Sequence, residues 1–155
     1  MPQSHLDASV TTLKVDSSVT GLKLVVEPLE SETTSVGVTT VTLSSDVLFE
    51  FGKATLTPTA QSKIAQIATR LAAARGTVTV VGHTDAIGSL QDNQALSSAR
   101  ASAVRAALLQ GLAGKPLQIA ASGVGETQPV APDMLGGKDN PAGRALNRRV
   151  VITFR

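Results

Sequence analysis

The stretch TVTVVGHTDAIG at residues 77–88 decides which fold this sequence predicts. Its first five residues are threonine and valine, which is typical of a short buried strand. A loop follows, with Asp85 between Gly82 and Gly88. A helix is then predicted over residues 91–112, where a glycine and a proline close it. The stretch therefore predicts a strand, a loop and a helix in succession, with polar side chains on the loop at the strand's end.

A first helix is predicted upstream of this strand. Thr57 and Pro58 provide an N-cap and a first helical residue at positions whose early N–H groups have no helical partner. Gly76 is expected to end this helix. Residues 41–43 and 47–49, which precede it, are predicted to be strand. Apolar residues at spacings of three and four form one stripe along the helix: Ile64, Ile67, Ala68 and Leu71.

The downstream sequence completes the expected order of elements. Residues 117–121 form a third core strand, and residues 123–145 are rich in glycine and proline and are predicted to be long and mostly irregular. The last strand, at residues 148–154, places its apolar side chains on one face by alternation. This order predicts an α+β fold: a two-layer β/α sandwich with a mixed sheet and helices packed on one face.

The length of 155 residues accommodates one domain of ordinary size and a short appendage. Residues 1–40 are rich in Ser, Thr and Val and contain short strand-like runs at 22–26 and 36–41. We predict that residues 1–40 are an N-terminal extension, either a β-hairpin or a linker. Residues 41–155 are predicted to be the domain that carries the function.

The composition excludes several classes of function. A net charge of +2 from 14 basic and 12 acidic residues, with three aromatic residues, does not favour a nucleic-acid partner. The absence of cysteine excludes disulfides, thiolate metal sites and thiol catalysis. No apolar run approaches the ~20 residues of a membrane span, and no signal peptide is recognisable. We therefore expect any export signal or membrane tether to lie on a segment outside this chain.

Arg100 is the most informative position by periodicity alone. It lies in a row with Leu96, Val104 and Leu108, each four residues from the next, so a guanidinium occupies an apolar row of the second helix. Arginine keeps its proton in proteins, and a partly buried arginine needs an anionic or carbonyl partner. The alternative is that its stem lies along the sheet while its head reaches water. Periodicity leaves both interpretations open.

Two other polar residues of the 77–88 loop and the following helix also have more than one interpretation. Asp85 could cap the helix, close an Asx-turn, bind a cation or act as a general base. Asn93, just before or inside the second helix, could serve as a cap or clamp the loop.

The sequence favours neither a metal site nor a nucleotide site. His83 lies near Asp85, but the other histidine is His5, and no carboxylate cluster has the spacing of a metal site. No serine lies in a nucleophile-elbow pattern, and the glycines do not form a phosphate-binding loop. We therefore predict that the protein has no catalytic residues, no metal and no cofactor.

Five motifs follow one another along the chain: VLFEF at 47–51, GHTD at 82–85, NQALSSARA at 93–101, GVGE at 123–126 and NRRV at 147–150. Taken together, they resemble the OmpA-like domain, a family that includes the C-terminal domains of OmpA proteins, peptidoglycan-associated lipoproteins and the flagellar stator protein MotB. The resemblance covers residues 41–155, and the order and gaps of the motifs are far more specific than any one of them.

The resemblance implies a ligand and a set of site residues. Members of the family bind diaminopimelate in the peptidoglycan stem peptide, and Asp85 and Arg100 match the family's ligand pair. Asn93 and Arg148 match positions that line the pocket, with Thr84 and nearby backbone N–H groups beside them. The free end of diaminopimelate is a zwitterion, and arginine offers a planar fork to its carboxylate while aspartate accepts from its ammonium.

The resemblance also implies a place and a role in the cell. We expect a non-enzymatic module in the cell envelope, in the periplasm or on the wall-facing side of a membrane, that anchors an envelope component to peptidoglycan. One alternative is a cell-wall hydrolase that uses Asp85 and His83. Another is a structural module that keeps the fold and binds a protein partner.

The sequence departs from the family pattern at two places. Phe51, Gly52 and Lys53 follow the first strand, where a polar residue close to the pocket is frequent, and Ile87 replaces a polar residue two positions after the aspartate. These departures predict a weaker affinity or a slightly altered ligand chemistry.

Overall fold

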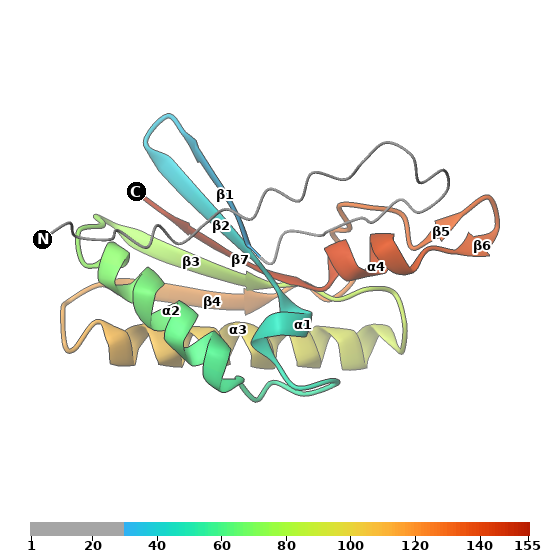
Figure 1. The fold of residues 1–155 in the computed structure, drawn as a ribbon, viewed down its shortest axis with the longest axis horizontal. Helices are drawn as coiled ribbons and strands as arrows, with labels where there is room; N and C mark the ends of the chain where they lie inside the picture. Colours follow the sequence, from blue (N-terminus) through green and yellow to red (C-terminus); the bar gives the residue numbers. More distant parts are fainter. Residues whose placement is uncertain (1–29) are drawn as a thin grey trace, which may run out of the picture.

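A five-stranded mixed sheet with helices on one face forms the frame of the molecule (Figure 1). The computed structural model describes residues 30–155. Its elements in chain order are β1 (Glu30–Ser35), β2 (Val38–Ser44), α1 (Ser45–Leu48), α2 (Pro58–Leu71), β3 (Thr77–Gly82), α3 (Leu90–Gly111), β4 (Gln118–Gly123), β5 (Met134–Leu135), β6 (Lys138–Asp139), α4 (Pro141–Asn147) and β7 (Arg149–Phe154).

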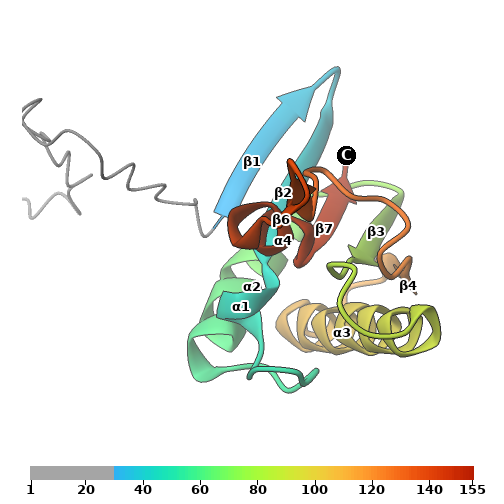
Figure 2. The ribbon, with the colours of Figure 1, turned by 90° about the vertical axis from the view of Figure 1, so that its right-hand side faces the viewer.

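The strands lie in the order β1-β2-β7-β3-β4. Strands β3 and β4 are parallel and are joined through α3, whereas the other neighbours are antiparallel. Helices α2 and α3 pack against each other on the same side of the sheet (Figure 2). The predicted fold class, a mixed sheet with helices on one face, is confirmed.

The core lies between this sheet and the two long helices. The side chains of β7 alternate as predicted, so that Val150 and Ile152 are buried. The apolar stripe of α2 is buried against the sheet, and the hydroxyl of Thr57 accepts from the N–H of Ala60 at 3.1 Å as an N-cap. The other large buried side chains come from β2, β3 and α3: Val41, Leu43, Val78, Val80, Val104 and Leu108.

Two predicted segments differ in the structure. Residues 47–49 were predicted to be strand, but α1 occupies Ser45–Leu48, because one helical turn buries both Ser45 and Leu48 while Phe49 is left to pair with Leu56. The segment 123–145, predicted to be mostly irregular, contains the β5–β6 hairpin and the start of α4. Helix α4 begins with a proline, which is favourable at a first helical position.

The sheet extends further toward the N-terminus than the predicted domain start. Strand β2 begins at Val38 and pairs along its length with β1, so the predicted boundary between residues 40 and 41 falls inside β2. Ion pairs join Glu30 to Lys63 and Glu32 to Arg70, and so fasten β1 to α2. The strand-like run predicted at residues 22–26 lies outside the described residues.

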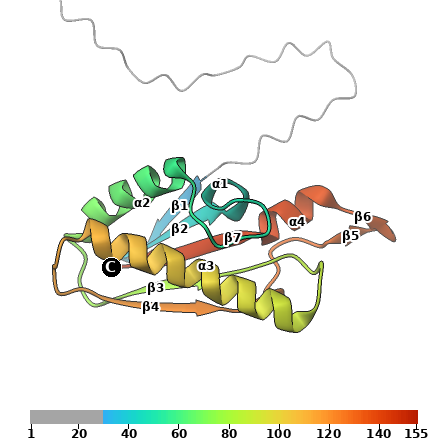
Figure 3. The ribbon, with the colours of Figure 1, turned by 90° about the horizontal axis from the view of Figure 1, so that it is seen from below.

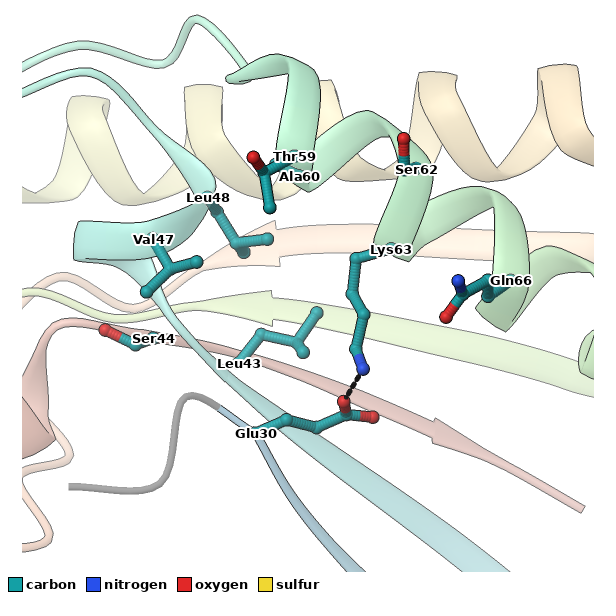
Figure 4. Close-up of a pocket in the computed structure, with 10 residues that line it drawn as sticks. All are labelled: Glu30, Leu43, Ser44, Val47, Leu48, Thr59, Ala60, Ser62, Lys63 and Gln66. Atoms are coloured by element: carbon teal, nitrogen blue, oxygen red, sulfur yellow. Dashed lines mark ion pairs between the residues drawn. The ribbon is translucent and has the colours of Figure 1, made fainter. Parts of the chain in front are cut away.

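An apolar cavity of about 340 Å³ lies between β2, α1 and α2 (Figure 4). Leu43, Val47 and Leu48 form its apolar wall, and the ion pair between Lys63 and Glu30 closes one side.

None of the helices described between residues 30 and 155 combines the length and the apolar character that a membrane span requires.

Segments that are distant in sequence lie together at the end of the molecule where β3 and β4 finish. Strands β3 and β4 finish there and α3 begins there, while α4 and the β5–β6 hairpin lie at the same end (Figures 1 and 3). Loops that follow the ends of parallel strands are a frequent place for binding sites, since the sheet holds them rigidly.

Candidate functional site

An open cavity of about 560 Å³ lies at this end of the sheet, and we call it the charged cavity. All five site residues predicted from the sequence line it, although they come from the loop after β3, from α3 and from the junction of α4 and β7. Its lining residues are Ser45, Asp46, Phe49, Glu50, Phe51, Gly52, Thr84, Asp85, Ile87, Asn93, Leu96, Arg100, Arg144 and Arg148.

Asp85 uses its two carboxylate oxygens differently. Oδ1 accepts from the backbone N–H of Ile87 at 3.2 Å, which closes the loop as an Asx-turn. Oδ2 accepts from Nη1 of Arg148 at 2.7 Å and lies 3.9 Å from Nε of Arg144. Asp85 therefore closes an Asx-turn and also binds a cationic side chain, that of Arg148. It does not cap α3, because the N-cap of this helix is Ser89.

Arg148 is held by carboxylates on two sides. Its Nε and Nη2 donate to the two oxygens of Asp46 at 2.9 and 2.8 Å, in addition to the bond with Asp85. The hydrogen bonds from the guanidinium to Asp46, and then to Asp85, raise the pKa of Arg148 above its ordinary value. The positive charge of Arg148 is thus already balanced within the protein.

Arg100 is buried, with 5% of its surface exposed, and its surroundings differ from those of Arg148. Its Nε donates to the backbone carbonyl of Lys53 at 3.0 Å, and its guanidinium carbon lies 5.2 Å from the centre of the Phe49 ring. Burial lowers the pKa of Arg100, but an arginine stays protonated even so. The carbonyl partner, rather than a head group that reaches water, is the interpretation that the structure supports.

Asp85 and Arg100, the two residues predicted to bind the charges of the ligand, do not form an ion pair with each other. Among residues 30–155, no carboxylate lies within ion-pair distance of Arg100, and Arg148 takes the place beside Asp85. Arg148 lies beside Asp85 because the tertiary structure packs the end of α4 against the loop after β3. The spacing of residues in the sequence does not reveal this contact. Arg100 is consequently a buried cation whose direct partners within the described chain are a carbonyl and an aromatic face, while the charges of Asp46 and Asp85 act on it from beyond ion-pair distance.

Asn93 and Thr84 complete the predicted set. Nδ2 of Asn93 donates to the carbonyl of Asp85 at 3.2 Å and to Glu126 at 2.5 Å, so the residue clamps the loop from inside α3. The backbone N–H of Thr84 donates to the carbonyl of Gly125 at 2.9 Å. Its buried hydroxyl has no hydrogen-bond partner in the described part of the chain.

Sequence reasoning missed three charged residues of the cavity, Asp46, Glu50 and Arg144. Glu50 belongs to one of the five motifs but was not named as a site residue. Asp46 lies on α1, a segment that was predicted to be strand, and Arg144 lies on α4, in a segment that was predicted to be irregular. Arg144 also forms an ion pair with Asp139. The four-residue spacing of Arg144 and Arg148 was the available signal, because residues at i and i+4 share a face once the segment is helical.

His83 is buried but does not line the charged cavity. Burial, and secondly the nearby charge of Arg149, lower the pKa of His83 to about 4. An imidazole with this pKa is a weak base near neutral pH. Within residues 30–155, no group of three or more His, Cys, Asp or Glu side chains is placed to hold a metal ion.

His83 should make the stability of the domain sensitive to acid. Its pKa is about 4 in the folded state and near 6.5 in the unfolded chain. Between these pH values the unfolded chain binds more protons, so the free energy of unfolding falls as the pH falls. We expect the wild-type protein to lose more stability between pH 6.5 and 4 than His83→Gln, as measured by urea unfolding. Equal losses in the two proteins would contradict the burial of a neutral imidazole.

The fold and the cavity define an α+β sandwich domain with a concave polar site at the ends of its parallel strands. The chain belongs to the OmpA family, because the model of that family matches residues 48–142, which is more than half of the chain.

Individual relatives agree with this membership. The chain is 41% identical over 142 residues to outer membrane protein A of Klebsiella aerogenes, a match that covers 84% of this chain and 39% of that protein. The chain therefore spans about two fifths of the length of this relative.

Solved structures with the same fold are also found. The cell wall anchor of the T6SS from Pseudomonas aeruginosa is 31% identical with a TM-score of 0.68, over 81% of this chain and 87% of that one. The peptidoglycan-associated lipoprotein from Burkholderia pseudomallei is 31% identical with a TM-score of 0.57, over 70% of this chain and 88% of that one. These relatives are proteins of the cell envelope.

Proposed function

We propose that this domain binds peptidoglycan without cleaving it, through the diaminopimelate of the stem peptide, and thereby anchors an envelope component to the cell wall. The observation that carries the proposal is the buried guanidinium of Arg100, which lines the same cavity as Asp85 and lacks a carboxylate partner among the described residues. The relatives that are named for cell wall anchoring and peptidoglycan association support this class of ligand.

The charges of the cavity favour a carboxylate at Arg100. Arg148 is neutralised by Asp46 and Asp85, and Arg144 is paired with Asp139. Arg100 uses Nε for the Lys53 carbonyl, which leaves its two terminal nitrogens for the fork that a carboxylate matches. A buried cation without a hydrogen-bonded anion is costly, so a ligand carboxylate would supply the direct partner that Asp46 and Asp85, which act on Arg100 only from a distance, do not provide.

An ammonium group fits beside Asp85. Because Asp46 accepts two hydrogen bonds from Arg148, the positive charge of Arg148 is not neutralised by Asp85 alone. The single bond between Arg148 and Asp85 orients the carboxylate, and the free hydroxyl of Thr84 lies on the same loop. A ligand with one carboxylate and one ammonium on the same carbon, such as the free end of diaminopimelate, matches this arrangement.

The same geometry favours binding over catalysis. None of the serine or threonine hydroxyls that line the charged cavity donates to a histidine or a carboxylate, so the lining holds no activated hydroxyl. His83, the partner of Asp85 in a hydrolase mechanism, lies outside the lining and is a weak base. Asp46 and Asp85 both form an ion pair with the same arginine, Arg148, which favours a binding role for these carboxylates.

A sedimentation assay with purified sacculi tests this proposal. We expect the protein to pellet with sacculi that contain diaminopimelate and to pellet poorly with walls that contain lysine, which lacks the second carboxylate. We also expect no release of reducing sugars or stem peptides above the level of an inactive control protein. Release of fragments would favour a hydrolase, whereas failure to pellet with either wall would favour a protein-interaction module.

A further inference from the structure

Two large apolar side chains are exposed where the charged cavity opens. Phe51 is 101% exposed and Ile87 is 62% exposed, yet both line the cavity. They belong to different loops, one after α1 and one after β3. Exposed apolar residues are common on proteins, so exposure alone assigns no role to them.

The loop that carries Phe51 is held in a defined shape. The N–H of Glu50 donates to the carbonyl of Thr55 at 3.2 Å, and the N–H of Lys53 donates to the carbonyl of Glu50 at 3.0 Å. The side chains of Glu50 and Lys53 form an ion pair at 2.7 Å. Gly52 has a φ of 68°, which turns the chain directly after Phe51. These contacts hold the backbone on either side of Phe51, whose ring is exposed to water.

The loop of each apolar residue is hydrogen-bonded to one of the two residues proposed to bind the ligand's charges, Arg100 and Asp85. Arg100 donates to the carbonyl of Lys53, two residues after Phe51, at 3.0 Å. Asp85 accepts from the backbone N–H of Ile87 at 3.2 Å. The side chains that would hold the ligand's charges thus also position the loops that bear the apolar groups.

We propose that Phe51 and Ile87 contact the aliphatic part of the ligand, between its zwitterionic end and the peptide. This inference rests on the proposed function. When the charged end lies between Arg100 and Asp85, the methylene chain has to leave the cavity through its opening, where the two apolar side chains stand. Removing these methylenes from water adds affinity that a zwitterion without a chain does not receive. The apolar rim therefore selects for the length of the ligand as well as for its charges.

The test compares two probes by NMR titration, which suits weak binding. One probe is the tripeptide L-alanyl-γ-D-glutamyl-meso-diaminopimelate, and the other is alanine, a zwitterion without the methylene chain. We expect Phe51→Ala and Ile87→Ala each to lower the affinity for the tripeptide by about three- to tenfold. Their affinity for alanine should change by less than twofold. Phe51→Leu should keep most of the tripeptide affinity, because it restores an apolar side chain.

Leu135→Ala is the matched control, since Leu135 is 58% exposed but lies outside the charged cavity. It should bind the tripeptide like the wild-type protein. Tripeptide binding by Phe51→Ala and Ile87→Ala within twofold of wild type would overturn the apolar contact and leave the proposed function intact. An equal loss for both probes would also overturn it, because the loops would then act by positioning the charges. Wild-type protein that binds neither the tripeptide nor sacculi would instead refute the proposed function itself.

Discussion

Replacing Arg100 with alanine should lower the affinity of the folded domain for diaminopimelate-type peptidoglycan by roughly thirtyfold to several-thousandfold. This corresponds to about 2 to 5 kcal/mol, the usual cost of truncating one partner of a buried, charge-assisted contact. The reason is that Arg100 is the guanidinium of the cavity whose terminal nitrogens are not paired with a carboxylate in the described chain. Binding to sacculi and to the tripeptide would measure the loss.

Arg105→Ala provides a control on the same helix for this experiment, at an arginine that is exposed rather than buried. Arg105 lies on the same helix and also donates through Nε to a backbone carbonyl, that of Ile119 at 2.8 Å, but it does not line the charged cavity. Its removal should leave binding near the wild-type level. Arg100→Lys should bind poorly, because an ammonium cannot offer two parallel hydrogen bonds to one carboxylate. A folded Arg100→Ala protein with near-normal binding would refute the site assignment and, with it, the proposed function.

Replacing Asp85 with asparagine should reduce binding to a similar extent, roughly thirtyfold or more. The amide has nearly the same shape and keeps an oxygen that can accept from the N–H of Ile87, so the loop can stay closed. What is lost is the negative charge that faces the ligand's ammonium. The change also leaves Arg148 with one carboxylate, Asp46, in place of two. The tripeptide titration is the direct measurement.

Two checks separate the loss of ligand contact from the loss of fold. Asp92→Asn removes a carboxylate at the start of α3 that hydrogen-bonds with Ser89 outside the charged cavity, and it should bind normally. Thermal unfolding of Asp85→Asn should show a cooperative transition, since a removed partner of an ion pair can destabilise a domain by itself. If the folded Asp85→Asn protein keeps its affinity, Asp85 has only a structural role in the loop.

The two predictions also test which carboxylates of the cavity pair with which arginines. In the structure Asp46 and Asp85 share Arg148, while Arg100 rests on a carbonyl and on the ring of Phe49. Arg144 and Arg148 therefore have carboxylate partners, whereas Arg100 has none within ion-pair distance among the described residues. Asp85 and Arg100 are both buried although they do not pair with each other.

The local patterns of the sequence were sufficient for the frame of the fold. The alternation at Val150 and Ile152 and the helical stripe through Ile64 both hold in the structure, because each pattern matches the period of its element. The cap at Thr57 was recognisable for the same reason, since the capping hydrogen bond spans three residues. The row of Leu96, Arg100 and Val104 placed an arginine on the apolar face of α3, although periodicity left open whether its head is buried or reaches water.

The tertiary structure alone decided which charges meet. Asp46 and Arg148 are 102 residues apart in the chain, and Arg148 and Asp85 are 63 apart, so no local period relates them. Short helices such as α1 and α4 add to the difficulty, because one or two turns carry too few residues for a period to show. The sequence by itself thus determined the layers and placed Arg100 in an apolar row, and the family resemblance named five of the residues that line the charged cavity. The pairing of Asp85 with Arg148, which leaves Arg100 without a carboxylate within ion-pair distance among the described residues, follows only from the packing of α4 against the loop after β3.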